Sequence, residues 1–202
     1  MSDVKSNTID YYNRNAASFL ADTLTVDMQA LYDEFLPLLP NKGLILDLGC
    51  GSGRDSLAFV NHGFDVHAFD ASAAMVKQAR QLVPQAQISQ ADFGAYHTTE
   101  RFDGLWACAS LLHVPANELT QVFARCASWL NPKGVFYCSF KYGEQAVERN
   151  GRYFTDLTET GLEHYLQGTG LAVKKLWLTG DKRPGRAHEQ WLNALLVKAV
   201  SP

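Results

Sequence analysis

Residues 44–56 combine an apolar run, a carboxylate and alternating glycines within one short stretch. The run Leu44–Leu48 contains Asp47 and leads directly into three glycines and a segment that can form a helix. This order predicts a buried parallel strand, a tight turn and a helix N-terminus, which is where an α/β sheet holds a nucleotide-like cofactor. Because glycine has no Cβ, the turn lets the backbone approach such a ligand closely. The three glycines are Gly49, Gly51 and Gly53.

Asp47 indicates what kind of ligand the turn accepts. A carboxylate just ahead of the glycines would repel a pyrophosphate, but it suits a ligand that carries an amine and a sulfonium cation. The glycine spacing is G-x-G-x-G, which differs from the G-x-G-x-x-G of dinucleotide binders. The free N–H groups of the next helix suit the carboxylate of a methionine moiety. The alternative is a turn whose glycines serve packing alone.

Further acidic residues stand where the second and third expected strands end. Asp70 follows the strand expected at 65–69, about where an acidic residue beyond such a turn accepts hydrogen bonds from both ribose hydroxyls. Its alternative role is simple capping of the helix expected to begin at Ser72. Asp92 follows the short strand expected at 87–89, in a turn where aspartate is also common for structural reasons.

His113 is the candidate catalytic residue. It comes after the strand expected at 104–108, and ligands of parallel sheets sit at the carboxyl ends of the strands. Its ordinary pKa near 6.5 would let it take a proton from a hydroxyl, thiol or amine. The alternative is a histidine that hydrogen-bonds locally and only shapes the pocket. A base is not required in every case, because positioning alone can supply about 7–11 kcal/mol of a barrier.

The remaining elements alternate between strand and helix, as a parallel sheet requires. Two helices are expected before the glycine turn, and two late strands joined by a polar loop predict an antiparallel hairpin at the end of the sheet. A turn is expected at 131–134, ahead of the fifth strand. The helices are expected at 8–21, 26–38, 53–62, 72–83, 116–130 and 158–168, and the later strands at 135–140, 172–178 and 190–197.

Composition excludes several classes of function. The chain has 202 residues, of which 47% are hydrophobic and 19% charged, and its net charge of −3 gives no support for coating a nucleic acid. No apolar run approaches the roughly 20 residues of a membrane span, and the N-terminus lacks the apolar centre of a signal peptide. The four cysteines lack paired spacing, which favours reduced thiols in the cytoplasm. The six histidines show no metal-ligand spacing, so no metal is expected. We expect a single domain over 1–202.

The motif Gly49–Arg54 and the segments after it resemble the class I S-adenosylmethionine-dependent methyltransferases, closely over residues 40–140. They are similar to the small bacterial enzymes of the tellurite-resistance and ubiquinone-biosynthesis types. Asn131-Pro132-Lys133-Gly134 stands where that family usually has Lys-Pro-Gly-Gly. The resemblance implies a doubly wound, Rossmann-like α/β fold, with a mostly parallel seven-stranded sheet, an antiparallel C-terminal hairpin and helices on both faces.

The resemblance also implies a cofactor, S-adenosyl-L-methionine, with S-adenosyl-L-homocysteine as product. In the family, the residue at Asp92 contacts the adenine amine, Phe93 adds a backbone N–H, and backbone around Cys108 faces the cofactor amine. Cys108 itself is expected to be a small apolar core thiol, not a nucleophile. The cofactor-binding residues implied are Tyr11, Asp47, Gly49, Gly51, Gly53, Arg54, Asp70, Ala71, Asp92, Phe93 and Cys108.

Residues 1–40 resemble the helical lid that such enzymes fold over the cofactor. Tyr11 or Tyr12 would then present an aromatic face to a sulfonium, worth about 0.5–2 kcal/mol, although both can be ordinary helix-packing residues. The segments 149–154 and 182–186 would lie across the substrate mouth. Their arginines would pair with an anionic substrate, or simply be solvated loop charges.

The expected activity is transfer of the methyl group of S-adenosylmethionine to an O, N or S atom of a small molecule. The chain lacks the Asn/Asp-Pro-Pro-Tyr type of signature, which argues against nucleic-acid base amines as acceptors. The expected partners are a small-molecule acceptor and no membrane, in a monomer or homodimer. The alternatives are a nicotinamide-dependent oxidoreductase and a non-catalytic module that only binds S-adenosylmethionine.

Overall fold

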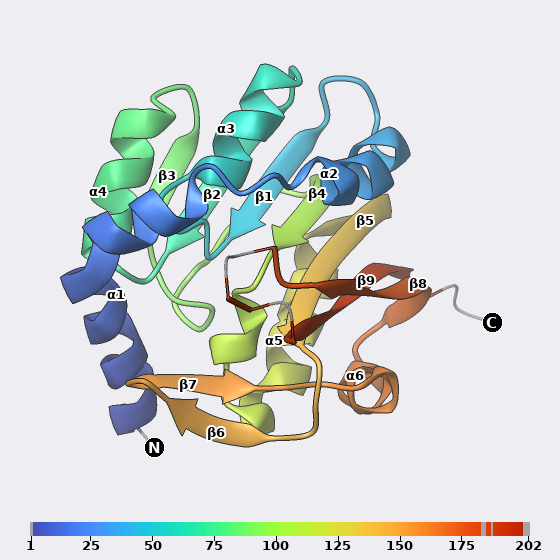
Figure 1. The fold of residues 1–202 in the computed structure, drawn as a ribbon. Coiled ribbons are helices and arrows are strands. Elements are labelled where there is room, and N and C mark those ends of the chain that lie inside the picture. The colour runs from blue at the N-terminus through green and yellow to red at the C-terminus, as the bar shows by residue number, and fades with distance from the viewer. Residues whose placement is uncertain (1, 183–184, 187, 200–202) are drawn as a thin grey trace.

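The computed structural model describes residues 2–182, 185–186 and 188–199. Within these ranges seven strands form one sheet in the order β3-β2-β1-β4-β5-β9-β8 (Figure 1). Strands β1 to β5 are parallel, whereas β9 is antiparallel to both of its neighbours. This confirms the doubly wound sheet with an antiparallel C-terminal hairpin. The strands are β1 (Leu44–Leu48), β2 (Asp65–Asp70), β3 (Gln87–Gln90), β4 (Phe102–Ala107), β5 (Leu130–Lys141), β8 (Leu171–Gly180) and β9 (Gln190–Lys198).

Helices cover both faces of the sheet because side chains alternate between the faces along each strand (Figure 1). On β1, Ile45 packs into one apolar cluster with Phe35 and Phe59, and Leu46 packs into another with Phe123. One face carries α2 (Gln29–Phe35), α3 (Arg54–Asn61) and α4 (Ala73–Leu82), and the other carries α5 (Leu119–Trp129) and α6 (Glu159–Leu166). Short 3-10 turns lie at η1 (Leu36–Leu38), η2 (Leu111–His113) and η3 (Ala116–Glu118).

Side-chain caps start two of the predicted helices. The Ser72 hydroxyl accepts a hydrogen bond from the backbone N–H of Met75 at 3.2 Å, at the start of α4. The Thr158 hydroxyl does the same for Gly161 at 3.3 Å, at the start of α6. Each cap satisfies one N–H that has no partner within the helix.

Strand β5 differs from the sequence prediction because it begins at Leu130 and includes the turn expected at 131–134. Leu130 pairs with Phe102, and the next pairing joins Val135 to Gly104. Four residues of β5 therefore face the single residue between Phe102 and Gly104, and they bulge out of the ladder. The sequence prediction of a turn is right about the irregularity and wrong about where the strand begins.

The sequence analysis did not predict a second, two-stranded sheet formed by β6 (Ala146–Arg149) and β7 (Arg152–Thr155). Asn150 and Gly151 join these strands with φ values of 52° and 73°. Two central residues with positive φ, in the order Asn-Gly, are typical of a tight hairpin turn whose twist matches that of the strands. The Asn-Gly pair was the available signal for this hairpin.

Helix α1 (Ser2–Thr23) is longer than the predicted helix 8–21, and it bends at Asn15, whose φ and ψ are −112° and 15°. It runs along one side of the molecule from β7 toward α4, and it contacts both (Figure 1). No helix in the described part of the chain is both long enough and apolar enough to cross a membrane.

Candidate active site

A cavity of about 750 Å³ opens at the carboxyl ends of the parallel strands. This volume lies within the range of small-molecule and cofactor sites. Residues of α1, β7 and the β8–β9 hairpin also line it. Most of the predicted site residues meet here, namely Gly49, Gly51, Arg54, Asp70, Ala71, Asp92, Phe93, Cys108 and His113. Tyr11, Asp47 and Gly53 are not among the lining residues.

The glycine turn brings backbone close to the cavity wall. At Gly49, with φ of 74°, an added Cβ would lie 2.6 Å from the Cβ of Ser110, so no larger residue fits without a shift. Gly53 serves a different purpose. Its φ is 93° and it faces α4, where an added Cβ would lie 3.2 Å from Ala79 and Val83. Gly49 therefore shapes the cavity, whereas Gly53 lets α3 and α4 pack.

Asp70 connects the end of β2 to the glycine turn. One of its carboxylate oxygens accepts a hydrogen bond from the Gly51 N–H at 2.9 Å, and the other accepts from the Ser72 N–H at 2.8 Å. Burial raises the pKa of the Asp70 carboxyl, and these N–H donors act in the opposite direction. A carboxylate can accept about four hydrogen bonds, so the Asp70 carboxylate can still accept from a ligand. Asp70 lines the cavity, so it can serve a ligand with neighbouring hydroxyl groups.

Asp92 and Phe93 form the next part of the cavity wall. The carboxylate of Asp92 accepts hydrogen bonds from the N–H groups of Gly94 and Ala95, each at 2.7 Å, and so it stabilises the turn after β3. The Phe93 ring packs edge-on against Phe69, with ring centres 5.5 Å apart. Asp92 thus has a structural role in addition to its place at the cavity.

Asp47 lies beneath the cavity instead of lining it. It is only 2% exposed, and it accepts a hydrogen bond from the Ser56 hydroxyl at 2.6 Å. Its side chain points to the same face of β1 as Ile45, toward α3, because side chains alternate along a strand. Burial, followed by the nearby charge of Asp55, raises the pKa of Asp47 well above its usual value.

Asp55 is an important residue that the sequence analysis missed. Its carboxylate accepts hydrogen bonds from Tyr32 Oη at 2.6 Å, Trp106 Nε1 at 2.8 Å, and Arg54 Nε and Nη2 at 2.6 and 3.0 Å. Burial alone would raise the pKa of Asp55, but Arg54 and these donors hold it below its usual value. Arg54, predicted to bind cofactor, is therefore engaged with Asp55. The acidic residue in the first turn of α3 was the sequence signal.

His113 is held by hydrogen bonds on both ring nitrogens. Nδ1 lies 2.6 Å from the carbonyl oxygen of Tyr153, and Nε2 lies 2.9 Å from the hydroxyl of Tyr12. A carbonyl oxygen can only accept, so Nδ1 carries the proton. Burial lowers the pKa of His113 from 6.5 to about 4, which keeps the ring neutral at pH 7. Nε2 then accepts from the Tyr12 hydroxyl.

Tyr12, not Tyr11, is the tyrosine of α1 that lines the cavity. Besides its hydrogen bond to His113, its ring packs edge-on against Phe19 and Tyr11. Tyr11 instead lies under the guanidinium of Arg152, whose central carbon is 4.4 Å from the ring centre. The helical period decides this, because consecutive residues point about 100° apart around a helix.

The end of β4 provides the wall beside the glycine turn. Burial raises the pKa of the Cys108 thiol to about 12, so this cysteine is not a thiolate nucleophile at neutral pH. The next residue, Ala109, has a positive φ of 52°, and its N–H donates to the Ser139 hydroxyl at 2.9 Å. A non-glycine residue in this conformation is strained, and such strain is often found at functional sites.

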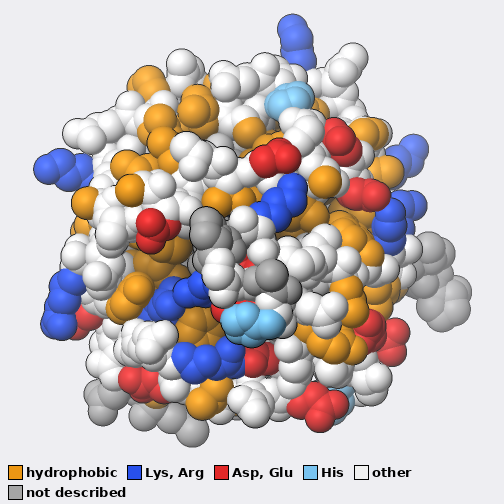
Figure 2. All heavy atoms as spheres, viewed as in Figure 1, with side chains coloured by type: hydrophobic (Ala, Val, Ile, Leu, Met, Phe, Trp, Pro, Cys, Tyr) orange, Lys and Arg blue, Asp and Glu red, His pale blue; other side chains and the backbone are white. Residues whose placement is uncertain are grey.

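Charged side chains gather around the cavity, and nearly all of them are paired. In Figure 2, Lys and Arg side chains lie in the middle of this face with acidic side chains beside them. The pairs are Lys5–Glu118, Arg54–Asp55, Lys141 with Asp181 and Glu189, Arg149–Asp156, Lys182–Asp27 and Arg186–Glu189.

Two residues of the predicted 182–186 segment, Arg183 and Pro184, lie outside the described residues. The described side chains include no group of three or more His, Cys, Asp or Glu residues arranged to hold a metal ion.

Comparison with known proteins agrees with this geometry. Residues 45–134 match the profile of a family described as "Methyltransferase domain". Over 100 residues the chain is 34% identical to trans-aconitate 2-methyltransferase of Escherichia coli, a match that covers 48% of this chain and 38% of that enzyme. The chain therefore spans well under two thirds of the curated relatives it matches.

Solved structures share the fold. One is 1,6-didemethyltoxoflavin-N1-methyltransferase of Burkholderia thailandensis, with that compound and S-adenosylhomocysteine bound. It is 19% identical, with a TM-score of 0.80 and coverage of 98% of this chain and 88% of that one. Another is an S-adenosylmethionine-dependent methyltransferase of Clostridium acetobutylicum, which is 15% identical with a TM-score of 0.70 and coverage of 93% and 99%.

The strand order, the glycine turn after β1 and the carboxylate after β2 define the Rossmann-like fold that these methyltransferase structures share. Residues 45–134 carry the profile of the methyltransferase domain family, and the chain shares the fold of solved S-adenosylmethionine-dependent methyltransferases.

Proposed function

We propose that this chain transfers the methyl group of S-adenosylmethionine to an O, N or S atom of a small-molecule acceptor. The observation that carries the proposal is the hydrogen bond from the Gly51 N–H to Asp70, which joins the glycine turn and the acidic residue at one cavity. The family match favours this activity over a nicotinamide-dependent oxidoreductase.

The residues at the cavity fit this cofactor. Gly49 and Gly51 leave backbone open to the ligand and would hold its methionine part, and the Asp70 carboxylate would accept from the two ribose hydroxyls. Ala71, Arg54 and Cys108 would complete the wall around it, and Asp92 and Phe93 would hold the adenine. When bound, S-adenosylmethionine supplies a methyl group on a cationic sulfur, and transfer leaves neutral S-adenosylhomocysteine.

We assign His113 to the acceptor side of the cavity. It follows β4, and its hydrogen bonds to Tyr12 and Tyr153 tie it to α1 and β7, the two elements that cover the cavity. Because the ring is neutral and its Nε2 accepts from Tyr12, it can receive a proton only when that hydrogen bond is exchanged for one from the acceptor. Helix α1 would act as the lid that excludes water.

The cavity and the relatives support a small-molecule acceptor. The relatives named above act on trans-aconitate and on 1,6-didemethyltoxoflavin, which are both small molecules. A cavity of about 750 Å³ accommodates the cofactor together with an acceptor of similar modest size. The four cysteines are free thiols in the structure, which supports our proposal that the chain works in the cytoplasm.

Replacement of Asp70 tests the cofactor site. We expect Asp70→Ala to weaken binding of S-adenosylhomocysteine by about 1–3 kcal/mol, because the ribose hydroxyls and the Gly51 N–H would lose their buried acceptor. Isothermal titration calorimetry measures the change. The matched control is Asp65→Ala, at the opposite end of the same strand and exposed, which should leave affinity unchanged. Equal affinity of the Asp70→Ala and wild-type proteins would contradict the assignment.

Turnover separates an enzyme from a silent binding module. The wild-type protein is incubated with S-adenosylmethionine carrying a labelled methyl group and with a metabolite extract. We expect labelled small-molecule products together with release of S-adenosylhomocysteine. Binding of the cofactor without any labelled product would favour the non-catalytic alternative, and binding of a nicotinamide dinucleotide in its place would favour the oxidoreductase.

A further inference from the structure

Arg152 is the cation at the cavity that the surrounding acids do not neutralise. The other described Lys and Arg side chains of the lining each have a carboxylate partner, whereas none of the described carboxylates forms an ion pair with Arg152. Its Nε is buried and has no hydrogen-bond partner. Buried polar groups are rarely left without a partner in native proteins, and an exception calls for an explanation.

Aromatic rings hold the Arg152 guanidinium in place. Its central carbon lies 4.4 Å from the centre of the Tyr11 ring, 5.2 Å from that of Phe154 and 5.9 Å from that of Tyr12. Such contacts favour a cation and fix the plane of the guanidinium. A side-chain hydrogen bond joins Arg152 to Tyr12, whereas the Nε of Arg152 has no partner. The charge is also felt nearby, because Arg152 partly offsets the burial that raises the pKa of Tyr12.

The location of Arg152 assigns it to the acceptor and not to the cofactor. It precedes Tyr153, whose carbonyl oxygen accepts the hydrogen bond from His113 Nδ1. Phe154, two residues further along β7, lies with its ring centre 4.9 Å from that of His113. Among the described residues, no hydrogen bond or ion pair joins Arg152 to the glycine turn or to Asp70. Arg152 thus stands beside His113, at the end of the cavity that we assign to the acceptor.

We infer that Arg152 binds an oxyanion group of the methyl acceptor. This inference rests on the proposed function. A guanidinium presents paired N–H donors that match two oxygens of a carboxylate or a phosphate ester, so both groups share the recognising chemistry. The oxyanion would satisfy the unpartnered Nε and neutralise the cation, and it would orient the acceptor relative to His113. A neutral acceptor would leave the Nε without a hydrogen-bond partner and the charge without a counter-ion.

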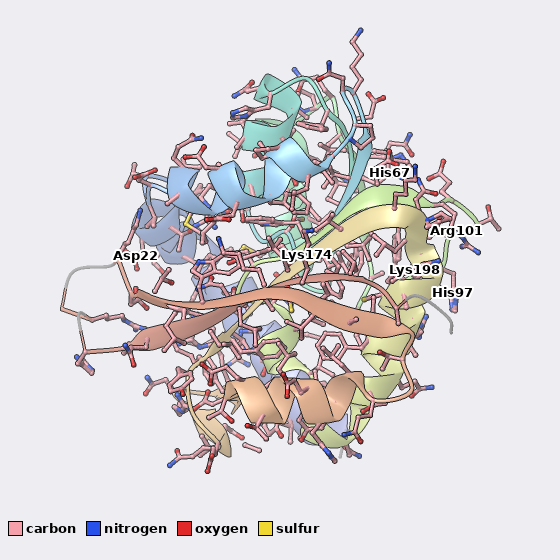
Figure 3. The ribbon with its side chains drawn as sticks, turned by 90° about the vertical axis from the view of Figure 1, so that its right-hand side faces the viewer. Asp22, His67, His97, Arg101, Lys174 and Lys198 are labelled. Atoms are coloured by element: carbon pink, nitrogen blue, oxygen red, sulfur yellow. The ribbon has the colours of Figure 1, made fainter. Side chains whose placement is uncertain are left out.

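The test uses labelled methyl transfer to a metabolite extract separated by anion exchange into an anionic fraction and an unbound fraction. The variants are Arg152→Gln, which removes the charge, and Arg152→Lys, which keeps the charge without the paired donors. The matched control is Arg101→Gln, which removes one positive charge ahead of β4. Figure 3 shows Arg101 on the opposite side of the molecule from Asp22, a residue of α1, the helix that covers the cavity. Calorimetry with S-adenosylhomocysteine and thermal unfolding accompany each variant.

We expect the wild-type protein to label the anionic fraction. At limiting amounts of that fraction, Arg152→Gln should lower the rate about ten- to a hundredfold, which corresponds to the worth of a hydrogen-bonded charge. Raising the amount of the fraction should restore part of the rate, because the loss is in acceptor affinity. The rate of Arg152→Lys should lie between those of the wild type and Arg152→Gln, and the rate of Arg101→Gln should match that of the wild type. Affinity for S-adenosylhomocysteine should stay within twofold. Loss of labelling after phosphatase treatment would identify a phosphate ester, and retention a carboxylate.

Several results would overturn the inference while leaving the proposed function intact. They are labelling of the unbound fraction alone, an Arg152→Gln rate equal to that of the wild type, or a loss of S-adenosylhomocysteine affinity in Arg152→Gln, which would give the cation to the cofactor. Absence of labelling in both fractions would overturn the proposed function, and the inference with it.

Discussion

Asp55→Ala is expected to destabilise the protein by about 3–5 kcal/mol, the cost of removing one partner from a buried ion pair. The substitution would leave the Arg54 guanidinium without its carboxylate and the buried Tyr32 hydroxyl and Trp106 N–H without their acceptor. These three donors come from α3, α2 and β4, so one carboxylate ties together three elements at the wall of the cavity. Urea unfolding followed by far-UV circular dichroism gives the difference in free energy of unfolding.

The control for this experiment is Asp33→Ala. Asp33 lies on the exposed side of α2, where it accepts a hydrogen bond from Gln29 at 2.7 Å, so its loss should cost less than about 0.5 kcal/mol. The loss of stability in Asp55→Asn should fall between those in Asp55→Ala and Asp33→Ala, since the amide side chain keeps an acceptor oxygen but carries no charge. A loss of less than 1 kcal/mol in Asp55→Ala would show that the network contributes little to stability.

His113 should make the stability of the protein depend on pH between about 4 and 6.5. Burial lowers its folded-state pKa to about 4, whereas the unfolded chain has the ordinary value of 6.5. In this window the unfolded state binds the proton and the folded state does not, so stability falls as the pH falls. The shift corresponds to a loss of about 3 kcal/mol between pH 7 and pH 4. In His113→Gln this contribution should be absent.

The measurement is the free energy of unfolding of both proteins at several pH values from 4 to 7. The difference between wild type and His113→Gln should shrink by about 3 kcal/mol as the pH falls. His62→Gln is the control, because His62 is exposed at the end of α3 and should leave the wild-type pH dependence unchanged. Parallel curves for the wild type and His113→Gln would contradict the buried, neutral state of this histidine.

Much of the sheet could be predicted because its signals are local. The apolar runs of β1, β2 and β4 fix buried strands, and the glycine turn fixes the start of α3 without reference to the rest of the chain. The position of Asp70 at the end of β2 followed from the same reasoning. The rule that parallel sheets bind ligands at the carboxyl ends of their strands then brought most candidates to one cavity.

The parts that escaped prediction depend on tertiary contacts. Asp47 of β1 lies beneath α3, where it accepts a hydrogen bond from Ser56, whereas Asp55 of α3 lines the cavity, and only the packed structure decides this. Tyr11 and Tyr12 are neighbours in the sequence, but the orientation of α1 relative to β7 determines which one lines the cavity. Whether Arg152 forms an ion pair could not be predicted for the same reason. The pairing of an arginine expected in a loop depends on acidic residues that are distant in the sequence.

The pairing of charges at the cavity mouth has a consequence for how ligands arrive. A cation and an anion side by side cancel over a few ångströms, and salt screens what remains beyond a Debye length of about 8 Å at physiological ionic strength. Diffusing ligands therefore feel little attraction from afar, and their association rates gain little from electrostatic steering. The cavity discriminates between ligands after they have entered, through short-range contacts. The difference between ligands then appears in their residence times.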